Sequence, residues 1–112
     1  MNVPDWSVPV VMQNAVQETG NGEVLETGNR GVAAIQISGS MTNLTVTFEG
    51  TVDGTNWVAI LATNRTSGTA ATTATAAGIY HIPAQGVVKV RARVSAWTSG
   101  VCTAVGIAVP SY

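Results

Sequence analysis

The sequence predicts an all-β domain, a two-sheet antiparallel β-sandwich of the jelly-roll or Ig-like type with about 7–8 short strands. Apolar and polar residues alternate with period two through several short runs, and turn-forming residues separate the runs. No stretch of useful length has the period of an amphipathic helix. With 112 residues, 46% of them hydrophobic, the chain has the size of one domain and enough apolar side chains for one core.

Residues 1–22 are predicted to form an extended N-terminal arm or an edge strand, and residues 23–112 the sandwich. Pro4 and Pro9 disfavour a helix in the first segment. As an edge strand, the segment would pair with the body of the domain. As an arm, it would dock on a neighbouring protein with Trp6 as its anchor, because aromatic residues dominate the energetics of interfaces. Both interpretations stay open, and Trp6, Val8 and Val10 are candidate assembly contacts.

Four runs have the clearest strand pattern, because β-branched residues recur in them at every second position. Each run has one predicted core face: Ile35 and Ile37 in residues 33–38; Leu44, Val46, Phe48 and Val52 in residues 44–52; Val88, Val90, Ala92, Val94 and Ala96 in residues 88–96; Val101, Val105, Ile107 and Val109 in residues 101–109. The opposite face of the last run has only small residues and is either a further candidate contact surface or an internal face: Cys102, Ala104, Gly106 and Ala108.

The remaining segments are shorter. Asp53-Gly54 marks a tight turn, and a return strand is expected over residues 57–61. Gly50 is expected to let the Trp57 ring lie across the paired strand, or to mark a bulge. Residues 79–82 form another short strand. Residues 66–78 are rich in Ala and Thr, which bury little area, so we expect a long surface connection with at most one weak strand.

Charge is scarce in this sequence. Charged residues make up 10% of the chain, against roughly 25% in an average domain, and the net charge is −1. Five Lys and Arg spread over the chain make a poor footprint for nucleic acid, and no polybasic run suits a membrane surface. Solubility must come largely from 15 Thr with Ser, Asn and Gly. A surface of low charge tolerates self-association, which suits a protein that sits in an assembly, although a well-hydrated Thr-rich domain would look the same. We expect no nucleic-acid or membrane partner.

The residues that usually carry catalysis or hold metals are also scarce. His81 and Cys102 are the single His and the single Cys, so the sequence offers no zinc-type ligand set and no nucleophile in a known motif. We expect no enzymatic activity, no cofactor and no metal. No basic residue precedes Arg30, as a secretory signal would require, so we expect synthesis and folding in a reducing cytoplasm.

One stretch of the sequence resembles a known family. Phe48-Glu49-Gly50-Thr51-Val52-Asp53-Gly54-Thr55-Asn56-Trp57 is similar to a module of tailed-phage virion proteins, in which a strand ends in Phe-x-Gly, an Asp-Gly turn follows and Trp opens the next strand. The likeness continues through Gly78-Ile79-Tyr80, residues 88–95 and Ser99-Gly100, and covers roughly residues 23–109. Such modules look like small β-sandwiches of capsid decoration proteins, head fibres and tail-associated proteins.

The resemblance implies a structural protein on the capsid surface of the virion. The leading candidate is a capsid decoration protein, which binds the major capsid protein or another virion protein outside the assembled shell and stabilises the shell. It would act as a homo-oligomer, with a trimer favoured. Lys89, Arg91 and Arg93 line one strand face. They form either a solvated face with Glu49 as a partner or a basic stripe that meets an acidic neighbour.

The alternative function is a carbohydrate-binding or fibre module that contacts host-surface glycans. Its candidate platform is the set of rings Trp57, Tyr80 and Trp97. Two of these rings side by side on the surface would favour sugar binding.

Overall fold

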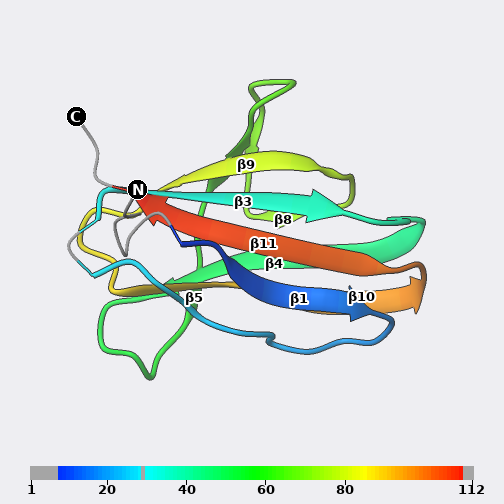
Figure 1. Cartoon of the computed structure of the whole chain (residues 1–112), viewed down its shortest axis with the longest axis horizontal. Helices are drawn as coiled ribbons and strands as arrows, with labels where there is room; N and C mark the ends of the chain where they lie inside the picture. The colour runs from blue at the N-terminus through cyan, green and yellow to red at the C-terminus, as the bar shows by residue number, and fades with distance from the viewer. Residues whose placement is uncertain (1–7, 29, 110–112) are drawn as a thin grey trace.

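The computed structural model describes residues 8–28 and 30–109. They form two antiparallel sheets packed face to face around one core, so the predicted β-sandwich class is confirmed (Figure 1). No helix occurs within these two ranges, and hence none that could cross a membrane.

The first sheet has six strands in the order β1-β11-β3-β9-β6-β7. In Figure 1 most of this sheet lies in front, with β1, β11, β3 and β9 running nearly parallel to the long axis. The bounds are β1 Val10–Val16, β3 Val32–Ser38, β6 Ala62–Asn64, β7 Ala70–Ala71, β9 Gly78–Pro83 and β11 Cys102–Val109.

The second sheet lies behind the first and has five strands. Four follow the order β2-β10-β4-β5, and β8 also pairs with β4. The bounds are β2 Leu25–Glu26, β4 Asn43–Thr51, β5 Val58–Ala59, β8 Thr73–Ala74 and β10 Lys89–Ser99. The long pair β4 and β10 forms most of this layer.

The described residues hold 11 strands, more than the sequence predicts, because four of them (β2, β5, β7 and β8) are only two residues long. Two of the four come from the Ala/Thr tract, where at most one weak strand is expected. β7 pairs with β6 in the first sheet and β8 with β4 in the second, so the tract crosses from one sheet to the other. The Tyr80 hydroxyl donates a hydrogen bond to the Ala76 carbonyl at 2.7 Å and ties the tract to β9.

The core fills the space between the sheets. Phe48 on β4 and Tyr80 on β9 link the two layers, with ring centroids 5.2 Å apart. Most of the predicted core positions on β3, β4 and β10 are buried: Ile35, Ile37, Leu44, Val46, Phe48, Val90, Ala92 and Val94.

The prediction is wrong for Val52 and Ala96. Val52 follows the end of β4 and is 72% exposed, and Ala96 is exposed because the register with β4 shifts between Val94 and Ala96. Val88 is half-buried.

β11 faces the opposite way from the prediction. Its small residues Cys102, Ala104 and Ala108 are buried in the core with Gly106, and Val101, Val105, Ile107 and Val109 are only partly buried. A Cβ atom on Gly106 would lie 2.6 Å from the Met12 sulfur and 3.2 Å from a Leu25 methyl. Large side chains from β1 and β2 therefore fill the core here, and only small residues fit on β11. The small face is not a contact surface, and burial raises the pKa of the Cys102 thiol.

Gly50 lies against two aliphatic side chains. A Cβ atom there would lie 2.9 Å from an Ile60 methyl and 3.0 Å from a Val87 methyl. Gly50 thus makes room for these two side chains, and its expected role toward the Trp57 ring stays a prediction.

Residues 10–16 form an edge strand of the sandwich, since β1 pairs with β11. The register shifts twice along this pair, and Ala15 has a positive φ of 49°. Such irregularities discourage edge-to-edge pairing with other chains. The buried Gln13 side chain donates hydrogen bonds to the carbonyls of Ala92 and Gly20, at 2.8 and 3.1 Å, and so ties β1 to the second sheet.

Candidate interaction surface

The orientation of β11 gives the first sheet an unusual outer face. Because the small residues of β11 point inward, its large aliphatic residues point outward, where a soluble sheet normally carries polar residues. The strand register aligns them with outward residues of β1, β3, β9 and β6 in three rows. These are Val11–Val105–Gln36–Ile79, Ile107–Ala34–His81–Thr63, and Val109–Val32–Pro83. We call these eleven residues the uncharged face.

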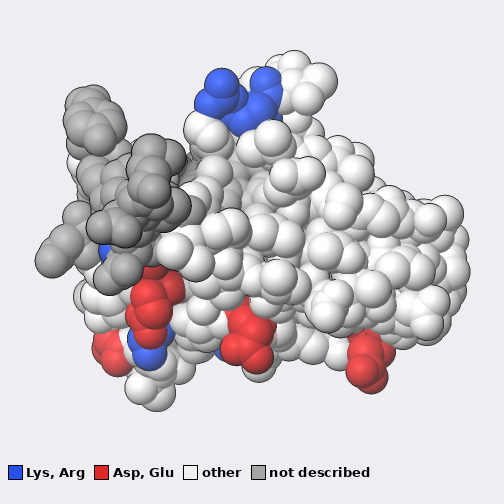
Figure 2. Space-filling view, in the orientation of Figure 1, with Lys and Arg blue, Asp and Glu red and all other residues white. Residues whose placement is uncertain are grey.

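The uncharged face contains no Lys, Arg, Asp or Glu. Figure 2 shows a broad white expanse over the front of the molecule, with charged residues only towards its borders. Val11 and Ile79 are 49% and 45% exposed, and the aliphatic residues of β11 between them are half-buried. A shallow hollow of about 300 Å³ lies between Ala34, Ile79 and Val105. Contiguous exposed apolar surface of this kind is typical of interaction sites.

The outer face of the second sheet is chemically different. Glu49 on β4 accepts a hydrogen bond from Arg91 Nε at 2.7 Å and lies 3.4 Å from Arg93 Nε. Thr47 and Ser95 share a hydrogen bond of 2.7 Å. This sheet thus follows the usual alternation of an apolar inner and a polar outer face.

The structure pairs all three residues of the predicted basic stripe with acids. Besides the two arginines on Glu49, Lys89 lies 3.8 Å from Glu26. Arg91 is also covered by the Trp57 ring, whose centroid is 4.2 Å from the guanidinium carbon. The partnership with Glu49, expected for a solvated face, is therefore present. Contact of Lys89, Arg91 or Arg93 with another protein stays a prediction.

The three rings of the candidate glycan platform lie in different environments. Tyr80 is 5% exposed and packs on Phe48 in the core. Trp57 lies over Arg91, and Trp97 is six residues further along β10, which corresponds to about 20 Å of strand. Trp97 is 37% exposed, and its indole N–H donates to the Gly100 carbonyl at 2.9 Å. No two of these rings lie side by side on the surface.

The candidate contacts near the start of the chain are partly described. Val8 is 53% exposed and Val10 half-buried, and both line a hollow of about 380 Å³ with Glu26 and Arg30. Trp6 lies outside the described residues, so its role as an anchor stays a prediction.

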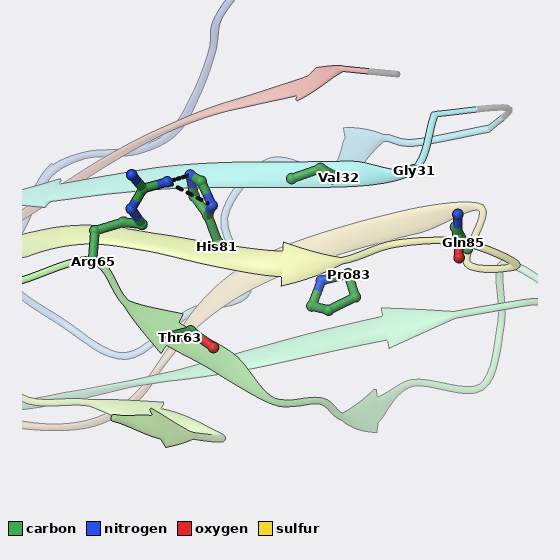
Figure 3. Close-up of a pocket in the computed structure, with 7 residues that line it drawn as sticks. All are labelled: Gly31, Val32, Thr63, Arg65, His81, Pro83 and Gln85. Atoms are coloured by element: carbon green, nitrogen blue, oxygen red, sulfur yellow. Dashed lines mark hydrogen bonds between the residues drawn. The ribbon is translucent and has the colours of Figure 1, made fainter. Parts of the chain in front are cut away.

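His81 lies on the uncharged face, next to Arg65, which directly follows β6. Arg65 Nη1 is 3.1 Å from Nδ1 and 3.2 Å from Nε2 of the imidazole (Figure 3). Partial burial, and secondly the positive charge of Arg65, lower the pKa of His81 below its usual 6.5, which favours the neutral form of the ring. Within residues 8–28 and 30–109, no group of three His, Cys, Asp or Glu could hold a metal ion.

Sequence reasoning missed the uncharged face because it assigned the larger side chains of β11 to the core. Two residues carried the opposite signal. Cys102 belongs to a residue type that is usually buried, and the polar Thr103 lies on the same strand face as Val101 and Val105. Together they indicate that the face with the small residues points inward.

Comparison with known proteins agrees with this architecture. The family model described as XepA matches residues 7–108, which includes most of the N-terminal segment that the virion-module resemblance left out. The SPBc2 prophage-derived protein YomS aligns over 96% of this chain and 96% of its own, with a TM-score of 0.81 and 20% identity. The PBSX exported protein XepA aligns over 90% of this chain, with a TM-score of 0.84 and 16% identity.

The chain spans only 37% of the solved XepA chain. No curated protein sequence matches it. At these identities the structural likeness shows the fold alone.

Proposed function

Since the chain belongs to the XepA family, we propose that it is a structural protein of a tailed-phage particle that works by binding and not by catalysis. The prophage origin of both solved relatives supports a phage-associated role. XepA is described as an exported protein, which is compatible with a site of action on the virion or outside the cell.

The observation that carries this proposal is the contrast between the two outer faces. One face pairs its charges internally, and the other has no Lys, Arg, Asp or Glu and exposes aliphatic side chains. A face without charge meets a second copy of itself without like-charge repulsion, and covering it removes apolar surface from water. We propose that copies of the chain associate through the uncharged face into a homo-oligomer, for which a trimer remains our preferred state.

The finer proposal is that this oligomer decorates the outside of the capsid. A protein that binds only the assembled shell stabilises it by mass action. In this arrangement the major capsid protein is the partner, and Trp6, Val8 and Val10 are its candidate contacts. Lys89, Arg91 and Arg93 remain further candidates.

Co-sedimentation with empty shells of the phage that encodes the chain tests the decoration role. We expect the wild-type protein to pellet with the shells at a fixed ratio and to raise the temperature at which they disrupt. Val8→Lys should raise the Kd for the shells by about 30-fold, because an unpaired buried charge costs roughly 2 kcal/mol or more at an interface. Val58→Lys, at a 65% exposed position on β5, is the matched control and should pellet like the wild type. Wild-type protein that stays in the supernatant would remove the decoration assignment.

A further inference from the structure

A hollow on the side of the first sheet lies where the uncharged face meets Arg65. It has a volume of about 390 Å³, within the range of small-ligand sites, and its lining includes Val32, Thr63, Arg65, His81 and Pro83. Figure 3 shows Arg65 and His81 pointing toward one another at one end, with Pro83 and Val32 further along. A ligand would thus meet a cationic end and an apolar wall.

The strand register brings the polar groups of this hollow together. Thr63 on β6 is paired with His81 on β9, so both side chains point to the same side of the sheet. The backbone N–H of Arg65 donates to the Ile79 carbonyl at 2.9 Å and so continues the pairing of β6 with β9. Arg65, two residues after Thr63, therefore returns to that side. The backbone of two paired strands positions all three residues.

The charge of Arg65 is not balanced by any acid in the part of the chain that the structure describes. Lys89, Arg91 and Arg93 each have a carboxylate within 4 Å, whereas the contact of Arg65 is His81, a group that can itself become positive. The neighbours of His81 on the adjacent strands are Ala34 on β3 and Thr63 on β6, and neither can carry charge. A guanidinium beside an imidazole and a hydroxyl is a donor set suited to an oxyanion.

We propose that Arg65, His81 and Thr63 form a binding site for an oxyanion, a phosphate or carboxylate group carried by a small ligand. Arg65 supplies a permanent charge and planar donors, His81 supplies a ring N–H, and Thr63 a hydroxyl. The apolar wall of Val32 and Pro83 would contact the body of the ligand. All of its groups come from a single chain, and since Val32, Thr63, His81 and Pro83 also belong to the uncharged face, the site is accessible in a chain whose uncharged face is not covered by a second copy.

NMR titration of His81 tests the site directly, because it is the single His of the chain and gives an isolated signal. An anion bound next to the imidazole favours its charged form. Inorganic phosphate at constant ionic strength should therefore raise the pKa of His81 by about 1, relative to the same ionic strength of chloride. Methyl phosphate and acetate, added separately, show whether the site takes phosphate, carboxylate or both.

Arg65→Gln provides the discriminating variant. Without anion it should raise the pKa of His81, because it removes the neighbouring positive charge, and it should abolish most of the response to phosphate. Arg30→Gln removes the same charge elsewhere and should leave the response unchanged. An equal phosphate response in Arg65→Gln, or no response of the wild-type protein to any of the three anions, would overturn the proposal.

Discussion

At the scale of single residues, Gly106 decides which way β11 faces. Its inward side lies against Met12 and Leu25, which are 1% and 3% exposed and have little room to move. Gly106→Val should therefore destabilise the fold by about 1–3 kcal/mol, although valine is otherwise favourable in strands. Urea unfolding measures the difference.

Ala34→Val is the control for this substitution, because Ala34 lies on the uncharged face and an added side chain there points to solvent. It should change the free energy of unfolding by less than about 0.5 kcal/mol. If Gly106→Val were as stable as the wild type and Ala34→Val were not, the orientation of the sheet would be wrong.

Asp53 holds the turn between β4 and β5 through its carboxylate. The carboxylate accepts hydrogen bonds from the backbone N–H groups of Asn56 and Thr55, then from the side chains of Asn56 and Thr51. These bonds hold the pKa of Asp53 well below its ordinary value of 3.8, although the group is exposed. Since the folded state binds its proton less readily, the stabilisation is complete above pH 3.8 and is lost as the pH falls below it.

Asp53→Asn removes this titration. We expect the urea midpoint of the wild type to exceed that of the variant at pH 6, and the difference to shrink steadily as the pH falls below 3.8. A difference that stays constant down to pH 2 would contradict this role of the carboxylate.

At the scale of elements, β1 is joined to the rest of the molecule by a side chain as well as by its strand pairing. Gln13→Leu removes the side-chain donor to the Ala92 and Gly20 carbonyls, so it should cost about 1–3 kcal/mol. It should also speed hydrogen exchange at Val94, whose N–H donates to Gly20 next to the lost bonds.

Gln17→Leu makes the same substitution at an exposed position just after β1 and should be nearly neutral. Equal effects of Gln13→Leu and Gln17→Leu would show that Gln13 does not link the sheets.

The sequence predicts elements well where a strand has one large apolar face and one polar face, as in β3 and β4. It fails at β11, where both faces are uncharged and the choice between them depends on Met12 and Leu25, which approach from distant parts of the chain. The two-residue strands were missed for a related reason. β7 and β8 are fixed by pairing with β6 and β4 and not by a local pattern.

At the scale of the whole molecule, the sequence could not locate the candidate surface, again because the surface depends on how distant segments pair. The low charge of the chain predicted a molecule suited to assembly, but composition does not say on which side the few charges lie. The structure pairs acids with bases over β4 and β10, and it leaves the eleven residues of the uncharged face without charge, with Arg65 beside them at the border. That asymmetry appears only when the register of five strands is known.

The mass of the protein in solution tests most directly whether the uncharged face joins copies of the chain. Light scattering should give a multiple of 11.5 kDa for the wild type and for Val58→Lys, with three copies as the favoured number. Val11→Lys introduces the same charge into the uncharged face and should reduce the mass to that of one chain, while circular dichroism shows that the fold is retained. A wild-type protein of one-chain mass at all concentrations, or an oligomer that Val11→Lys leaves intact, would contradict the account.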